Sequence, residues 1–149
     1  MIKEEINTLL EQEPYGVLCT QSPEGAFGYL MALAYSPDLK SFFLAASIHS
    51  RKKQILCQPI PVALVIDNRA KYPEDIMKVS VVTLTGDSVL LKPEEENYQW
   101  GSMQLAHRHP ELKAFIEDTS TVLFQIRVRN YVYVSRFQEV RYWTPGSGA

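Results

Sequence analysis

The first residues of the chain carry apolar side chains at the spacing of an α-helix. These side chains are Ile2, Ile6, Leu9 and Leu10, and they share one side of a helix over residues 3–12. Pro14 follows them and favours an end to the helix. The pattern predicts an N-terminal helix with one buried face.

From residue 15 onward the pattern changes to short apolar runs separated by turns rich in Pro, Gly, Ser and Asp. The runs predict strands at 15–20, 26–36, 41–47, 61–69 and 79–91. The run at 26–36 is almost continuously apolar, so we expect that strand to be buried on both faces. Gly86, inside the last run, indicates a bulge or a close approach of two backbones.

Two further segments predict helices. Residues 50–57 begin with Ser50, a typical N-cap, and are followed by Pro59. Residues 92–118 form the main helical stretch, which we expect Gly101 and Pro110 to divide into two or three short helices. The last strands are predicted at 121–137 and 139–143.

Strands and helices do not alternate one by one in this order. Such an order favours an antiparallel sheet or small barrel of about six strands with appended helices, rather than a parallel α/β fold. We therefore expect a mainly β protein with a single domain over residues 1–149 and a flexible tail at about 144–149.

Composition narrows the choice of partners and of compartment. The formal net charge is −2 and the pI about 5.9, so no global basic field favours nucleic acid. Cys19 and Cys57 stand in apolar surroundings and are expected to be buried, unreactive thiols. The N-terminus does not look like a signal peptide, and no apolar run reaches membrane-spanning length. We expect a cytoplasmic protein.

One basic cluster stands against this neutral background. Arg51, Lys52 and Lys53 occupy the first turn of the helix predicted after Ser50. The N-terminal end of a helix is partially positive, and a cation there costs up to about 1 kcal/mol. The cluster therefore indicates a bound small anion, and the alternative is a solvated helix end without a function.

The order of these motifs resembles the pyridoxamine 5′-phosphate oxidase-like split β-barrel family of flavin proteins. The motifs are "YGVLCTQSPEGAFGYL", the Ser-Arg-Lys segment inside "SFFLAASIHSRKKQIL", "PIPVALVI", "VVTLTGDSVLL" and "HRHPEL". The Ser-Arg-Lys segment directly after the third strand is the most specific of them. The resemblance covers most of the chain and implies a homodimer with cofactor sites between the subunits.

By the same resemblance, FMN is the expected cofactor and its contacts can be placed on this sequence. Residues matching the phosphate site are Ser50, Arg51 and Lys52. Residues matching the strand that faces the flavin ring are Leu30, Met31, Ala32 and Leu33, and those matching the strand end beside the ribityl chain and phosphate are Ala45, Ala46 and Ser47. A phosphate would meet free backbone N–H groups and two cations there. The favourable free energy of these contacts outweighs the cost of placing cations at the positive end of the helix.

The sequence also departs from the oxidases of vitamin B6 metabolism. Leu30 stands where those oxidases carry a phosphate-binding Arg, and the chain lacks their final Arg-x-His motif. We therefore expect no pyridoxamine phosphate oxidation. Haem is the rival cofactor, because other branches of the superfamily carry a similar segment around His49. Haem needs an axial ligand, commonly His, and the C-terminal tail has none.

Two histidines and two tryptophans are further candidates for functional roles. His107 and His109 are expected in a solvated helix junction rather than in a metal site. Trp100 or Trp143 could stack on the flavin across a dimer interface, and the sequence does not choose between them.

We expect an FMN-binding flavoprotein that acts as an oxidoreductase on a small molecule. The alternatives are a flavin or haem binding and storage module without turnover, and a structural dimer with an empty groove. No metal, nucleic acid or membrane is expected as a partner, and no catalytic acid or base can be ranked.

Overall fold

The computed structural model describes residues 1–50 and 59–146. Its helices are α1 (Ile2–Gln12), α3 (Glu96–Arg108) and α4 (Lys113–Glu117), with 3₁₀ turns η1 (Arg69–Lys71), η2 (Ile76–Lys78) and η3 (Pro110–Leu112). Its strands are β1 (Tyr15–Ser22), β2 (Gly25–Ala32), β3 (Ala34–Tyr35), β4 (Ser41–Ser47), β5 (Ile60–Asp67), β6 (Val81–Leu91), β7 (Thr121–Ser135) and β8 (Glu139–Trp143). The basic helix predicted at 50–57, with Arg51 and Lys52, lies outside the described residues apart from Ser50.

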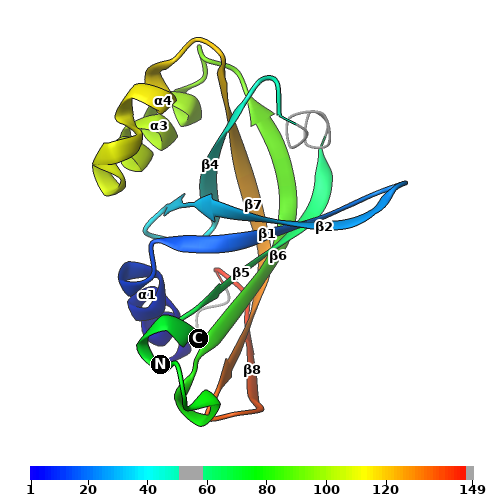
Figure 1. Cartoon of the computed structure of the whole chain (residues 1–149), viewed down its shortest axis with the longest axis vertical. Helices are drawn as coiled ribbons and strands as arrows, with labels where there is room; N and C mark the ends of the chain where they lie inside the picture. Colours follow the sequence, from blue (N-terminus) through cyan, green and yellow to red (C-terminus); the bar gives the residue numbers. More distant parts are fainter. Residues whose placement is uncertain (51–58, 147–149) are drawn as a thin grey trace.

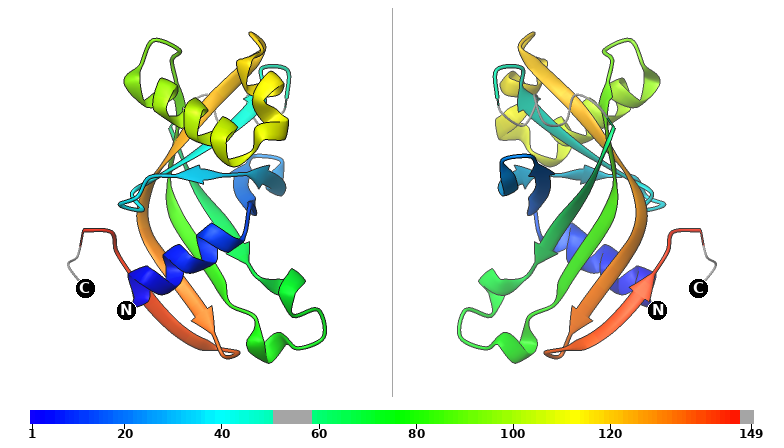
Figure 2. Two further views of the ribbon diagram at one scale, coloured as in Figure 1. Left: turned by 90° about the vertical axis from the view of Figure 1, so that its left-hand side faces the viewer. Right: turned by 90° about the vertical axis from the view of Figure 1, so that its right-hand side faces the viewer.

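The strands form one strongly curled antiparallel sheet (Figures 1 and 2). Their order is β2-β1-β5-β6-β7-β4-β3, and β8 pairs with the far end of β7. β2 and β3 stand at opposite ends of this order although only Leu33 separates them in the chain. The sheet must therefore curl until its two edges meet at Leu33. This confirms the prediction of a mainly β, barrel-like fold.

The predicted strand at 26–36 is wrong in two respects. The chain breaks it at Leu33 into β2 and β3, which pair with different partners, β1 and β4. β2 is an edge strand of the described sheet rather than a central one, and its residues are mostly exposed or half-buried. Although the strand is apolar, its residue Leu30 is 72% exposed.

The core lies inside the curl, and α1 closes one side of it. Ile6, Leu9 and Leu10 of α1 pack into the same buried cluster as Leu18 and Leu64 of the sheet, as predicted. Burial of an aliphatic side chain contributes about 1.5–3 kcal/mol. This packing is the main force that holds the helix in place.

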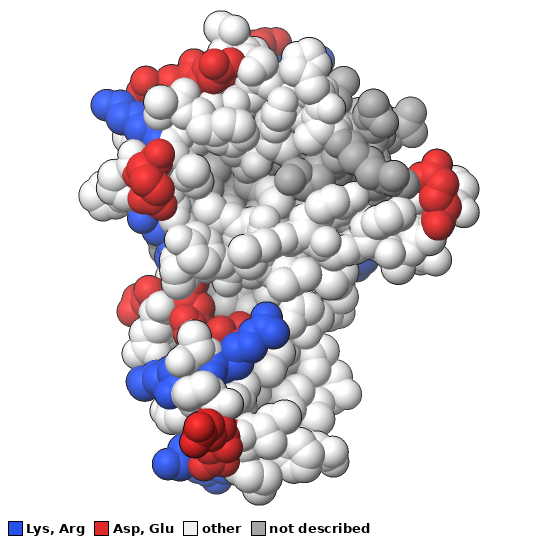
Figure 3. All heavy atoms as spheres, viewed as in Figure 1, with Lys and Arg blue, Asp and Glu red and all other residues white. Residues whose placement is uncertain are grey.

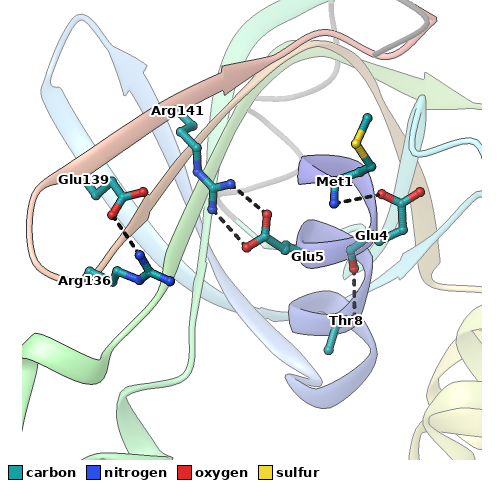
Figure 4. A network of polar contacts seen from close by, with 7 residues as sticks. All are labelled: Met1, Glu4, Glu5, Thr8, Arg136, Glu139 and Arg141. Carbon is teal, nitrogen blue, oxygen red and sulfur yellow. Dashed lines mark hydrogen bonds and ion pairs between the residues drawn. The ribbon is translucent and has the colours of Figure 1, made fainter.

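An ion pair adds to the attachment of α1. Figure 4 shows the Glu5 carboxylate facing the Arg141 guanidinium of β8, with two N–O distances of 2.7 and 3.1 Å. Arg136 and Glu139 lie 3.8 Å apart on the neighbouring hairpin. The two-point contact fixes the helix against the last strand.

Glycines explain two further details. Gly86 lies at a register shift between β6 and β7, and a Cβ there would collide with the Arg127 carbonyl oxygen. The predicted close backbone approach is confirmed. Gly101, by contrast, does not divide the helical stretch, because α3 runs through it; a Cβ there would collide with the Phe43 ring. Pro110 does separate α3 from the following turns.

The outward side chains in the middle of β1, β5 and β6 are small and uncharged, and Asp67 and Asp87 flank them on β5 and β6. We call the following half-buried residues of β1, β5 and β6 the outer face: Val17, Cys19, Ala63, Val65, Thr83 and Thr85. In the view of Figure 3, the centre of the molecule is almost without charged side chains among the described residues. Within the described residues, no helix is long and apolar enough to span a membrane.

Candidate functional site

A pocket of about 340 Å³ lies between β2, β4 and the helical segment. We call it the β2–β4 pocket. Its strand side is lined by Leu30, Met31, Ala32, Ala45, Ala46, Ser47 and Ser50, and its helical side by Leu105, Leu112, Phe115 and Ile116. The strand side consists entirely of positions that the sequence analysis singled out. β2 and β4 are brought together because the curl of the sheet returns β4 to the edge that β2 occupies.

One described site residue does not line this pocket, and two others cannot be placed. Arg51 and Lys52 lie outside the described residues. Leu33 is buried at the bend between β2 and β3, so its side chain belongs to the core. Its carbonyl oxygen accepts a hydrogen bond from Nε2 of His109, at 2.9 Å. The backbone of Leu33 thus joins the strand side to the helical side of the pocket.

A tight turn closes one end of the pocket. The Ser50 N–H donates to the Ser47 carbonyl oxygen at 3.0 Å, and the His49 N–H donates to Ser47 Oγ at 3.2 Å. Ser47 Oγ uses a lone pair in this bond, so its own hydroxyl hydrogen can still be donated to a ligand. The Ile48 N–H donates to the Ser120 carbonyl at 2.7 Å, which fixes the turn to the chain segment before β7.

The lining of the pocket suits a flat, largely apolar ligand with one polar end. Aliphatic side chains and one phenyl ring line most of it, and the hydroxyl-bearing residues Ser47 and Ser50 stand together at one end. Ligand pockets typically measure about 300–1,000 Å³ and are mainly apolar with a few placed polar groups. The residues present therefore fit a planar aromatic cofactor whose polar tail reaches the serine turn.

The sequence analysis missed the helical side of the pocket. Leu105 and Ile116 are buried, and together with Leu123 they form a second apolar cluster beneath α3 and α4. Nothing in the local pattern distinguishes these residues from ordinary core residues of an amphipathic helix. Only the tertiary arrangement places them opposite β2.

The two histidines of the helix junction differ from each other. His107 is exposed, as predicted, but His109 is only 2% exposed, so the expected solvated junction is wrong for this residue. A carbonyl oxygen can only accept, so Nε2 of His109 carries the hydrogen that is donated to Leu33. Nδ1 lies 3.6 Å from the Glu111 carboxylate, and the ring stacks on Tyr15. His109 joins elements and is not a free ligand.

Neither tryptophan lines the β2–β4 pocket. Trp143 is buried against Tyr131, with ring centroids 5.4 Å apart, and Trp100 packs on Phe43 at 5.3 Å. Both indoles are therefore used in packing within the subunit. The aromatic ring that does line the pocket is that of Phe115.

A second hollow of about 330 Å³ adjoins the first and shares Leu30 with it. Glu13 and Asp67 both line this hollow. Burial, and then the negative charge of Asp67, raises the pKa of Glu13, while Lys71 opposes this weakly. Arg69 also lines this hollow and pairs with Asp67 at 3.1 Å, so Leu30 has an apolar pocket on one side and charged groups of both signs on the other.

No metal centre is found in the parts of the chain that the structure describes. They contain no group of three His, Cys, Asp or Glu side chains arranged to hold an ion.

The comparisons with known proteins rest on structure alone, because no family model and no curated protein matches the sequence. A haem-binding protein from Mycobacterium smegmatis has a TM-score of 0.81 at 18% identity; 97% of this chain matches 58% of that one. A protein of the pyridoxinephosphate oxidase family related to general stress protein 26, from Clostridium acetobutylicum, has a TM-score of 0.68 at 16% identity. The match covers 95% of this chain and 92% of that one.

An FAD- and haem-binding protein from Mycobacterium smegmatis has a TM-score of 0.68 at 12% identity, covering 88% of this chain and 69% of its own. At these identities the comparisons show the fold. The chain has the split β-barrel fold of the pyridoxamine 5′-phosphate oxidase-like proteins, as the resemblance predicted. Among its structural neighbours are proteins that bind flavin and proteins that bind haem.

Proposed function

We propose that this protein binds FMN in the β2–β4 pocket and is an oxidoreductase acting on a small molecule. The observation that carries the proposal is the convergence of Leu30–Ala32 with Ala45–Ser47 and Ser50 on one pocket. These segments lie on and beside different strands, β2 and β4, and the family resemblance assigns both of them to one cofactor. A flavin-binding neighbour with the same fold supports the choice of cofactor.

The two ends of the pocket have the character that FMN requires. The apolar walls favour the ring system, and backbone groups of β2 are available to its polar edge. Ser47 and Ser50 stand at the end where the phosphate is expected, next to Arg51 and Lys52 in the sequence. Charge-assisted hydrogen bonds to a phosphate contribute about 1.5–3 kcal/mol each.

We also propose a homodimer with the cofactor sites at its interface. The six residues of the outer face are small apolar residues and threonines, and Arg129 stands at their margin, which is typical of an interface with an apolar centre and a polar rim. Leu30, 72% exposed, lies beside Val17 of this face and also lines the pocket. A second copy seated on the outer face would cover Leu30 and close the pocket.

The oxidoreductase part of the proposal rests on the chemistry of the cofactor. Bound FMN would supply the redox step, and this chain would supply binding, orientation and exclusion of water. The described lining offers no charged side chain over the ring region that could act as acid or base. A binding module without turnover therefore remains the alternative to an enzyme.

The test of FMN binding uses the visible spectrum of the purified protein and titration with FMN. We expect Arg51→Ala with Lys52→Ala to weaken FMN binding at least tenfold, because two phosphate contacts are lost. The matched control is Lys71→Ala with Lys78→Ala, which removes two cations that do not line the pocket. Unchanged FMN affinity in the first variant would contradict the assignment of the phosphate site to Arg51 and Lys52. A wild type without affinity for FMN would contradict the proposal as a whole.

Haem is the second candidate, favoured by the haem-binding structural neighbours and by the position of His49. His49 is exposed and lies between Ser47 and Ser50, which both line the pocket. An imidazole at that place is available as an axial ligand.

Haemin titration distinguishes the two cofactors. If haem binds through His49, the wild type will show a sharp Soret band and His49→Ala will shift or broaden it. The control is His107→Ala, which removes an exposed imidazole outside the pocket lining and is expected to leave the band unchanged. A band that responds equally in both variants would contradict ligation by His49.

A further inference from the structure

We propose that Phe115 is the side chain whose aromatic ring packs against the planar ring of the bound cofactor. This inference rests on the proposed function of the β2–β4 pocket. Among the described residues that line the pocket, the others are aliphatic or serine. Phe115 therefore supplies the π surface of the described lining.

The exposure of Phe115 needs an explanation. Phe115 is 40% exposed, although the next residue, Ile116, is buried in the cluster with Leu105 and Leu123. Phenylalanine usually buries most of its surface. A ring left open at the mouth of an apolar pocket would bury that surface when a planar ligand enters.

The backbone of Phe115 is held in place before any ligand binds. Its carbonyl oxygen accepts two hydrogen bonds, one from Thr121 Oγ1 at 2.5 Å and one from the Asp118 N–H at 3.2 Å. Ile116 anchors α4 from below. The ring therefore stands on a fixed support, which lowers the entropic cost of contact with a ligand.

The position opposite the strands gives the contact its geometry. Leu30–Ala32 of β2 and Ala45–Ala46 of β4 form one side of the pocket, and Phe115 belongs to the other. A flat ligand between these sides meets the backbone of the strands on one face and the phenyl ring on the other. Aromatic rings in such contacts lie about 4.5–7 Å apart between centroids.

The experiment compares Phe115→Leu and Phe115→Tyr with the wild type in titrations with FMN and, separately, with haemin. We expect Phe115→Leu to weaken binding of whichever cofactor binds by about three- to tenfold, and Phe115→Tyr to restore it to within about twofold. The matched control is Phe137→Leu. It removes a phenyl ring of similar exposure, 45%, from the turn between β7 and β8.

A second variant tests contact directly. Tryptophan quenches flavin emission by electron transfer at contact distance. Bound FMN should therefore be much less fluorescent in Phe115→Trp than in the wild type, while Phe137→Trp should leave its emission unchanged. This readout depends on contact and would not respond to a loss of stability alone.

The outcomes separate the two proposals. A wild type that binds neither FMN nor haemin overturns the proposed function and the role of Phe115 together. A wild type that binds, with unchanged affinity in Phe115→Leu and no quenching in Phe115→Trp, overturns the role of Phe115 alone. A loss in Phe115→Leu that Phe115→Tyr does not restore also counts against it, because the aromatic ring would then not be the cause.

Discussion

The pKa values of two glutamates, one near each end of α1, shift in opposite directions. The hydrogen bonds from Arg141 lower the pKa of Glu5, and the opposing effect of burial is smaller. Burial and the charge of Asp67 raise the pKa of Glu13. The folded state therefore favours the ionised form of Glu5 and the protonated form of Glu13. Their contributions to stability must depend on pH with opposite signs.

We predict that Glu5→Gln destabilises the protein at pH 7, by about 0.5–1 kcal/mol for an exposed two-point ion pair. The loss should shrink as pH falls through the lowered pKa of Glu5. Glu13→Gln should raise the free energy of unfolding at pH 7 by about 0.5 kcal/mol, because it removes a partly buried negative charge beside Asp67. That gain should vanish as pH falls below the ordinary range of a glutamate.

The measurement is urea unfolding of both variants and the wild type between pH 7 and about pH 3. Glu11→Gln serves as the control, since Glu11 is an exposed residue of the same helix that lines neither hollow. A destabilising Glu13→Gln at neutral pH would contradict the assigned direction.

The strand side of the candidate site could be predicted through the family resemblance, which the order of the motifs carries. The Ser-Arg-Lys segment indicates an anion site because its positive charges conflict with the dipole of the predicted helix. Leu105, Leu112, Phe115 and Ile116 could not be predicted, because each has the pattern of an ordinary packed helix. His109 was misjudged for a related reason: its partner, the Leu33 carbonyl, lies in a distant part of the sequence.

At the level of elements, the apolar run at 26–36 shows the limit of hydrophobic patterning. The pattern correctly indicated extended structure but could not show that one bend sends its two halves to opposite edges. Nor could it show that Leu30 remains exposed, because a residue that covers a cofactor or a partner is as apolar as one that fills the core.

Gly101 shows the converse error. Glycine lowers helix propensity by about 1 kcal/mol, which is why a break was expected. The helix continues because the missing side chain lets α3 approach the Phe43 ring. Close packing of α3 on β4 sets the position of the helical side of the pocket relative to its strand side. A residue that weakens an element locally can thus be required by the contact between two elements.

At the scale of the whole molecule, the proposed dimer can be tested by placing a charge on the outer face. Ala63 lies in the middle of this face, between Cys19 and Thr85 of the neighbouring strands. We predict that Ala63→Arg yields a folded monomer with weakened cofactor binding, since the new side chain points away from the core. Sedimentation velocity measures the oligomeric state.

The matched control for this variant is Met103→Arg. It adds the same charge to an exposed apolar residue of α3, which is not part of the sheet. The control should keep the oligomeric state of the wild type. A wild type that sediments as a monomer at all concentrations would rule out the dimer, and a dimeric Ala63→Arg would rule out this face as its interface.

The one-residue link at Leu33 limits how the protein can exchange a ligand. The Cα atoms of Ala32 and Ala34 can separate by at most about 7 Å, and β3 is paired with β4. The strand margins that flank the cavity are thus tethered and cannot gape. Because α4 is anchored through Ile116, a bulky guest must enter and leave past the exposed ring of Phe115 rather than between parting strands. Residence time would then be governed by contacts at that opening rather than by breathing of the sheet.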